Sequence, residues 1–126
     1  KPLAYGRVRQ TPFIGLPGNP VSAFVTFCLF GMPYVRVLQG AAQPFPIASK
    51  VCLGQAPPQP LKRREFIRVR LEHRADKLPI SQAFERQGSD VLTSTVWADG
   101  LLELPEDRAL EQFEVLNYWS FKELLG

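Results

Sequence analysis

Apolar residues recur at intervals of three and four between Val21 and Leu38, which is the spacing of one face of an α-helix. We therefore predict a helix there, with Asn19 as the N-cap, Pro20 at the first helical position and Gly40 as the C-terminal stop. Pro33 lacks a backbone N–H, so we expect a bend at this residue and no break. The apolar stripe, which we expect to be core or a seat for further α/β structure, comprises Val21, Phe24, Val25, Cys28, Leu29 and Met32.

Short alternating runs in the second half of the chain predict strands. In the clearest run, Glu65–Leu71, every second residue is apolar, and Phe66, Arg68 and Arg70 share the opposite face. Further strands are predicted over residues 47–53, 100–104 and 113–119, with a turn over 105–108 and a helical turn over 91–98. So many short strands favour a small antiparallel barrel or sandwich. The boundary between the α/β part and the β part is predicted at residues 40–46.

Composition narrows the class of protein. Of 126 residues, 45% are hydrophobic and 21% are charged, as in a soluble globular chain of about one domain. The net charge of +3 is too small to prove a nucleic-acid or membrane partner, because such partners need a charged patch. Cys28 and Cys52 form no CxxC pair and His73 is the single histidine, which excludes a disulfide scaffold and a zinc module. Prolines 57, 58 and 60 suit an extended linker or sheet edge. The chain opens without Met and has no apolar run of ~18 residues, so we expect a cytoplasmic piece of a longer protein.

The segment TPFIGLPGNPVSA, residues 11–23, predicts a strand that leads through a tight turn into the helix. The amides of a first helical turn have no intrahelical partner, and the helix dipole adds to their attraction for negative charge. Gly18 lets a ligand approach the backbone, while Pro17 and Pro20 fix the turn. The corner can therefore hold a phosphate, a carboxylate or a tetrahedral oxyanion. A well-capped corner without any ligand satisfies the same pattern.

GLPGNPVSA at Gly15–Ala23, preceded by KPLAYG at Lys1–Gly6, resembles the signature of the molybdopterin molybdenumtransferases, the MoeA and gephyrin E-domain family. The likeness continues with REF-R at Arg64–Phe66 and Arg68, QGS at Gln87–Ser89, S-ADGL at Ser94 and Ala98–Leu101, and LPE at Leu104–Glu106. It implies an α+β fold. Residues 1–42 would be the strand–turn–helix end of a MogA-like α/β domain, and residues 43–126 a small, mostly antiparallel β-barrel-like (β-clip) C-terminal domain.

The resemblance also implies a reaction. Enzymes of this family insert molybdate into adenylylated molybdopterin with release of AMP, and Mg²⁺ assists. The dithiolene sulfurs of the pterin hold the molybdenum, so no cysteine or histidine ligand is needed. We therefore expect a parent enzyme, a homodimer with no nucleic-acid or membrane partner, whose substrates are molybdopterin-AMP and molybdate. The family's Gly-rich phosphate loop and its acidic residues for molybdate and Mg²⁺ lie upstream, so this chain alone is expected to be inactive.

Matched motif by motif, the resemblance implies functional roles for individual residues. The catalytic residues would be Pro17, Pro20, Arg68 and Ser89, and the cofactor-binding residues Lys1, Gly18, Asn19, Val21 and Ser22, with no metal ligand in this chain. Arg68 would grip a phosphate or molybdate oxygen through its guanidinium, and Ser89 would add one hydrogen bond.

The residues by themselves leave other interpretations open. The basic run of residues 62–74, with Phe66 among its arginines, also suits a non-catalytic β-barrel module that binds RNA or protein. Glutamates dilute this run, so a plain solvated strand face is a third interpretation. Ser89 also fits an ordinary turn, and Trp97 and Trp119 fit core or interface positions better than a stacking platform.

Overall fold

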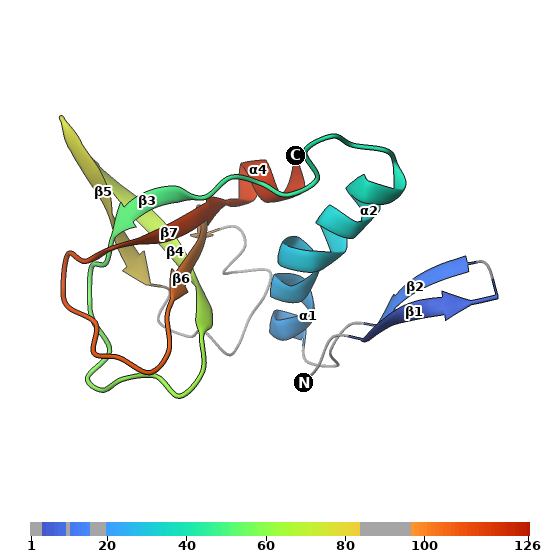
Figure 1. Ribbon diagram of the computed structural model, residues 1–126. Coiled ribbons are helices and arrows are strands. Elements are labelled where there is room, and N and C mark those ends of the chain that lie inside the picture. The colour runs from blue at the N-terminus through green and yellow to red at the C-terminus, as the bar shows by residue number, and fades with distance from the viewer. Residues whose placement is uncertain (1–3, 10, 16–19, 84–96) are drawn as a thin grey trace.

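The computed structural model describes residues 4–9, 11–15, 20–83 and 97–126. Three parts follow one another along the chain: a two-stranded hairpin, a long helix and a closed barrel (Figure 1). The hairpin consists of β1 (Ala4–Val8) and β2 (Thr11–Gly15), which pair antiparallel. In Figure 1 it projects from the helix on the side away from the barrel. The strand predicted ahead of the helix is thus confirmed as β2.

The predicted helix continues from Pro20 to Leu38 without a break, in three segments. They are α1 (Pro20–Thr26), the π-helical turn η1 (Phe27–Gly31) and α2 (Met32–Leu38). In η1 the backbone N–H of Met32 donates to the carbonyl of Phe27, five residues back. Pro33 follows directly and has no N–H to donate, so the widened turn takes up the irregularity that we expected as a bend.

Gly40 ends the helix, as predicted, in a Schellman motif. Its φ is 78°, in the left-handed region that favours glycine. Its N–H donates to the carbonyl of Val37 (3.0 Å), and the N–H of Ala41 donates to the carbonyl of Arg36 (2.9 Å). Pro20 is the first residue of α1, also as predicted. No helix in the described part of the chain is long and apolar enough to cross a membrane.

Five strands close into a barrel in the order β3-β5-β4-β6-β7. They are β3 (Ser49–Cys52), β4 (Glu65–Arg74), β5 (Lys77–Ala83), β6 (Gly100–Leu104) and β7 (Val115–Ser120). All neighbours pair antiparallel except β3 and β5, which confirms the predicted barrel. Ile67, Val69 and Leu71 face its interior, as the alternation predicts. This first core contains Val51, Leu53, Val69, Leu102, Leu104, Leu110, Leu116 and Tyr118.

β5 has no counterpart among the predicted strands. Its Pro79 removes a backbone donor, which in a sequence argues against a central strand. The register between β4 and β5 shifts between Glu72 and Arg74, so Pro79 lies opposite this irregularity. At this irregularity the β4–β5 pairing does not need a backbone N–H from residue 79, so the barrel accommodates a proline there.

A second hydrophobic core joins the helix to the outside of the barrel. It brings together η1, β6 and the short C-terminal helix α4 (Phe121–Leu125), which lies beside α2 in Figure 1. The rings of Phe24 and Phe121 meet edge to face, with their centroids 5.5 Å apart. The buried members of this core are Cys28, Ala98, Leu101, Phe121 and Leu124. Part of the apolar stripe is therefore core, as expected.

Arg36 ties α2 to the C-terminal end of α4. Its Nη2 donates to the carbonyl oxygens of Leu124 (2.8 Å) and Glu123 (3.3 Å). A cation at this position also suits the negative end of the helix dipole. At the other end of α4, the Ser120 hydroxyl accepts a hydrogen bond from the backbone N–H of Glu123 (3.1 Å). Both ends of this five-residue helix are therefore capped by side chains.

Candidate functional site

Arg68 lies in β4 with only 1% of its surface exposed. Its neighbours Ile67 and Val69 face the first core, so its side chain leaves the opposite face of the strand, toward the outside of the barrel. Leu101, directly across the β4–β6 pair, belongs to the second core on that same face. Burial lowers the pKa of Arg68 below its ordinary value, yet a guanidinium stays charged in proteins. Arg68 is therefore a desolvated cation where the barrel meets the helix.

The burial of Arg68 rules out a plain solvated strand face at the centre of the basic run, residues 62–74. The outer face of β4 is not a plain solvated face, because Arg68 is enclosed within it. The ring of Phe66 lies 5.9 Å from that of Trp119, and the guanidinium of Arg70 lies 4.8 Å from the ring centre of Trp97. Alternation along β4 shows that these side chains share a face. It does not show that Arg68 is buried on this face.

The other predicted site residues are placed only in part. Lys1, Pro17, Gly18, Asn19 and Ser89 lie outside the described residues, as does most of the helical turn predicted over residues 91–98. Pro20, Val21 and Ser22 form the first turn of α1. Further along, α1 packs on the second core, whose Leu101 lies directly opposite Arg68 in the β4–β6 pair. The amino end of α1 and Arg68 thus belong to adjoining elements, and the anion-binding role of the turn stays a prediction.

The ADGL motif serves the fold in this structure. Ala98 and Leu101 are buried in the second core. The Asp99 carboxylate accepts a hydrogen bond from the backbone N–H of Leu71 (2.8 Å), which joins the motif to β4. A Cβ on Gly100 would lie 2.2 Å from the carbonyl oxygen of Trp119, closer than atoms approach. Only glycine therefore fits this position without moving the backbone.

Several cations of the basic run are held by acceptors within the chain. Arg64 contacts the carboxylates of Glu103 (Nη1 to Oε2, 2.8 Å) and Glu106 (Nε to Oε1, 3.0 Å). A backbone hydrogen bond and the Arg64 guanidinium both lower the pKa of Glu106. Arg74 donates to the carbonyl of Leu78 through Nη2 (2.6 Å) and Nε (3.0 Å). The charge of Arg64 is thus paired with carboxylates, and the guanidinium of Arg74 is held in place by a backbone carbonyl.

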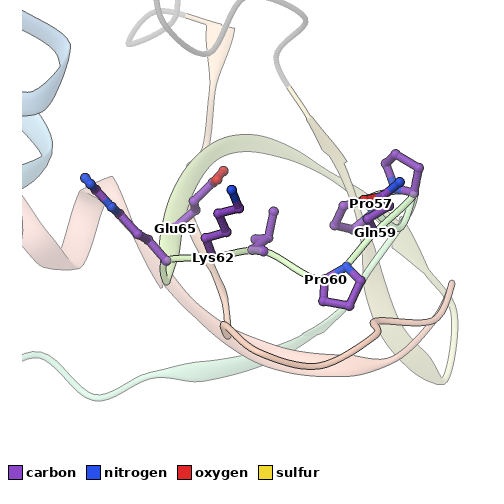
Figure 2. Close-up of a pocket in the computed structure, with 8 residues that line it drawn as sticks. Pro57, Gln59, Pro60, Lys62 and Glu65 are labelled. Atoms are coloured by element: carbon purple, nitrogen blue, oxygen red, sulfur yellow. The ribbon is translucent and has the colours of Figure 1, made fainter.

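The three prolines lie in the segment between β3 and β4, which contains no strand. Residues 57–63 and Glu65 line an open hollow of about 500 Å³, and Figure 2 shows Pro57, Pro60 and Lys62 on the segment that borders it. The carbonyl of Leu61 accepts a hydrogen bond from the N–H of Asp107 (2.9 Å) and anchors the segment. Its polar groups do not converge on one point, so the hollow defines no chemistry of its own.

A second hollow, of about 320 Å³, opens between the helix and the barrel. We call it the junction groove. Leu29 and Phe30 of η1, Phe45 of the linker, and Phe66, Glu103 and Trp119 of the barrel line it. Nothing in the sequence distinguishes Phe30 and Phe45 from buried phenylalanines, because an exposed aromatic residue and a buried one look alike in a sequence.

Neither cysteine nor acidic clusters build a metal site in the described ranges. There, no three His, Cys, Asp or Glu side chains gather around one point. Burial among apolar side chains raises the pKa of the Cys28 thiol to about 11, so the thiol stays protonated and acts as a packing group.

The fold and Arg68 together define a class of structure, a small closed barrel with a helix packed on its outer face and an arginine buried on that same face. Comparison with known proteins gives that class a family. Residues 50–121 match the family model of the MoeA C-terminal region (domain IV). The chain belongs to this family.

Similar proteins extend the match beyond the barrel. Molybdopterin molybdenumtransferase 2 of Mycobacterium tuberculosis is 36% identical over 106 residues, 84% of this chain and 25% of that protein. Molybdenum cofactor synthesis protein cinnamon of Drosophila melanogaster is 37% identical over 111 residues, 83% of this chain and 18% of that protein. The crystal structure of the molybdopterin biosynthesis moeA protein from Pyrococcus horikoshii superposes with a TM-score of 0.65 at 25% identity, over 93% of this chain and 29% of that one. This chain therefore spans a quarter or less of the length of these two relatives.

Proposed function

We propose that the protein to which this chain belongs is a molybdopterin molybdenumtransferase of molybdenum cofactor biosynthesis. It inserts molybdate into adenylylated molybdopterin, and AMP leaves when the nucleotide is cleaved. Mg²⁺ assists through residues outside this chain, and the protein works as a cytoplasmic homodimer. Family membership and the names of the similar proteins support this proposal. The observation that carries it is the buried charge of Arg68 where the barrel meets the helix.

The chemistry of the substrates explains why a buried cation suits this reaction. Molybdate and the phosphates of the adenylylated pterin are all anions, so they repel one another as they approach. A cation fixed in advance offsets that repulsion without rearranging during the reaction. Little water screens the Arg68 guanidinium, so its electrostatic interactions are stronger than they would be in water, and β4 holds it in place. The Arg68 guanidinium thus places a positive charge below the surface where the barrel meets the helix.

Substitution of Arg68 in the full-length protein tests the proposal. We expect Arg68→Met to lower the rate of AMP release about 100-fold and to weaken molybdate binding, since losing one preorganised donor costs about 10²–10³ in rate. Arg68→Lys should recover part of the rate because it restores the charge without the planar donors. Arg70→Met is the matched control, because Arg70 lies two residues along the same face but is exposed. It should stay within twofold of wild type.

Circular dichroism and thermal unfolding must accompany these assays, since removing a buried arginine also changes packing. A folded Arg68→Met variant that releases AMP at the wild-type rate would remove Arg68 from the mechanism. RNA binding that weakens steeply with salt and requires Arg63, Arg64 and Arg70 would instead favour the non-catalytic module.

A further inference from the structure

We propose that η1 is a register hinge, a turn that lets α2 rotate about the helix axis by one residue position relative to α1. The structure shows one register, in which η1 is π-helical and Arg36 faces α4. In the second register η1 would be α-helical, and Val35 would take the position of Arg36. The hinge rests on the geometry of the helix, and its effect on catalysis rests on the proposed function.

The helix contains one residue more than its contacts with the barrel need. In a regular α-helix residue i+7 lies within about 20° of residue i around the axis, and residue i+8 lies about 80° away. Counted from the buried Cys28, these residues are Val35 and Arg36. The structure shows the reverse, because Arg36 contacts the carbonyl of Leu124 in α4 whereas Val35 is 36% exposed. A turn that closes at i+5 holds one extra residue and shifts every later residue by one position, so η1 accounts for the difference.

Met32 and Pro33 show the same shift. Helical spacing puts Met32 on the buried stripe, four residues after Cys28. In the structure Pro33 is fully buried and Met32 is only partly buried. The buried line therefore runs from Cys28 to Pro33 and Arg36, one position later than a regular helix would place it.

The residues in and after η1 disfavour a rigid, regular helix. Pro33 has no N–H for the carbonyl of Leu29, and its ring crowds that carbonyl when the helix is regular. Gly31 makes room for the ring of Phe27, because a Cβ on residue 31 would lie 2.7 Å from it. Helices bend at proline, at glycine and at π-turns, and π-turns are frequent at functional sites. Pro33 thus favours the observed register, and neither residue makes the helix stiff.

The two registers exchange one favourable contact for another. The observed register has two hydrogen bonds from Arg36 to carbonyls of α4 (2.8 and 3.3 Å) and leaves Val35 partly exposed. The alternative would bury more of Val35, return Arg36 to water and restore the regular hydrogen bonds of an α-helix. Packed helices change between discrete arrangements of this kind, so we expect a minor population of the second register.

The hinge lies beside the face of the barrel that carries Arg68. Leu29 and Phe30 of η1 and Phe45 of the linker line the junction groove on this face. A change of register would move Phe30 around the helix axis and, through α2, would move the linker. On the proposed function, the hinge would thereby regulate access of the anionic substrates to Arg68, and opening steps of this kind limit the turnover of many enzymes.

Deletion and insertion of one residue in η1 test the register in the full-length protein. Deleting Phe30 (ΔPhe30) should remove the extra residue and leave a regular helix with Arg36 still facing α4. Amide hydrogen exchange of residues 121–126 should then stay within about threefold of wild type. Inserting one alanine between Phe30 and Gly31 should turn Arg36 away and speed this exchange about tenfold, as expected for lost hydrogen bonds. Deletion and insertion damage a regular helix equally, so equal effects would overturn the register assignment.

Pro33→Ala tests whether the second register exists. The variant restores the N–H that a regular helix uses, so the equilibrium should shift toward the α-helical form. In NOE spectra of methyl-labelled protein, contacts between the methyl groups of Val35 and Leu124 should appear. Val37→Ala is the matched control, an exposed position of α2 that should produce no such contact. If Pro33→Ala is folded and shows no contact between Val35 and Leu124, η1 has a single register and the hinge is wrong.

Assays of AMP release separate the hinge from the proposed function. ΔPhe30 has a single register, so its rate should fall about fivefold relative to Phe30→Ala, which lacks the same ring but keeps the extra residue. Equal rates in these two variants would remove the hinge from turnover. With Arg68→Met strongly impaired, that result would still sustain the proposed function. Wild-type AMP release in Arg68→Met would contradict the role of Arg68, whatever the hinge does.

Discussion

The two hydrophobic cores of this protein are built in different ways. The first fills the barrel with side chains from strands whose alternating pattern is visible in the sequence. The second lies on the outside of the barrel and collects residues from η1, β6 and α4, of which η1 and α4 are about 90 positions apart along the chain. The buried guanidinium of Arg68 lies on the side of the second core. The comparison teaches that the strand pattern builds the scaffold, while the charge proposed for function lies where distant segments meet.

Gly100 lies between the two cores, so changing it should have the largest effect. A Cβ there would lie 2.2 Å from the Trp119 carbonyl and 2.6 Å from the Tyr118 hydroxyl. Gly100→Ala should therefore lower the free energy of unfolding by about 3–4 kcal/mol, at the upper end of overpacking effects. Urea unfolding measures it. Gly40→Ala, where a Cβ meets nothing but φ is positive, should cost only about 1 kcal/mol, and equal costs would contradict this account.

Truncation of one leucine in each core separates their roles. Leu102 and Leu124 are both fully buried, and each Leu→Ala change should cost about 3 kcal/mol. Leu102→Ala should lower hydrogen-exchange protection throughout the barrel strands. Leu124→Ala should lower it first in α4 and α1, because its core lies outside the barrel. Identical protection patterns in the two variants would mean that the cores unfold as one unit.

Arg36 offers a smaller test of the second core. Arg36→Met keeps much of the alkyl chain but removes both hydrogen bonds to the carbonyls at the end of α4. The expected loss is about 1 kcal/mol, typical of a hydrogen bond near the surface. Chemical denaturation should detect it, with Leu125→Ala as a control at an exposed position of α4 that stays within about 0.5 kcal/mol.

The smallest expected effect is a pH dependence from Cys28. Burial raises the pKa of its thiol from 9.0 to about 11, so above pH 9 the unfolded chain loses this proton while the folded chain keeps it. The contribution of the protonated Cys28 thiol to the free energy of unfolding is fully present below pH 8. It should fall by about 1 kcal/mol by pH 10. Burial and the charge of Asp99 also raise the pKa of Tyr118, which adds loss in the same direction at higher pH.

The difference between two proteins isolates the contribution of Cys28. Unfolding free energies of wild type and Cys28→Ala should be compared at pH 8 and pH 10. The variant should lose less stability over this interval than the wild type. Parallel losses would show that the Cys28 thiol does not titrate differently in the two states.

Local pattern predicted most of the elements. Helical spacing gave the helix from Pro20 to Leu38 and its stop at Gly40, and alternation gave β4 and the strand at residues 100–104. The sequence did not predict β5, because its Pro79 is tolerated only opposite the register shift between Glu72 and Arg74 of β4. This shift depends on how the two strands pair. These signals are local, since they concern side chains and backbone groups within a few residues of each other.

The surroundings of the candidate site were decided by tertiary structure. The sequence by itself determined that Arg68 shares a strand face with Phe66 and Arg70, and its motifs pointed to the family. Only the tertiary structure decided that Arg68 is buried on this face and that a groove lies between the helix and the barrel. The physical reason is that burial and desolvation depend on segments far apart in the chain, and no local spacing records which segments will meet.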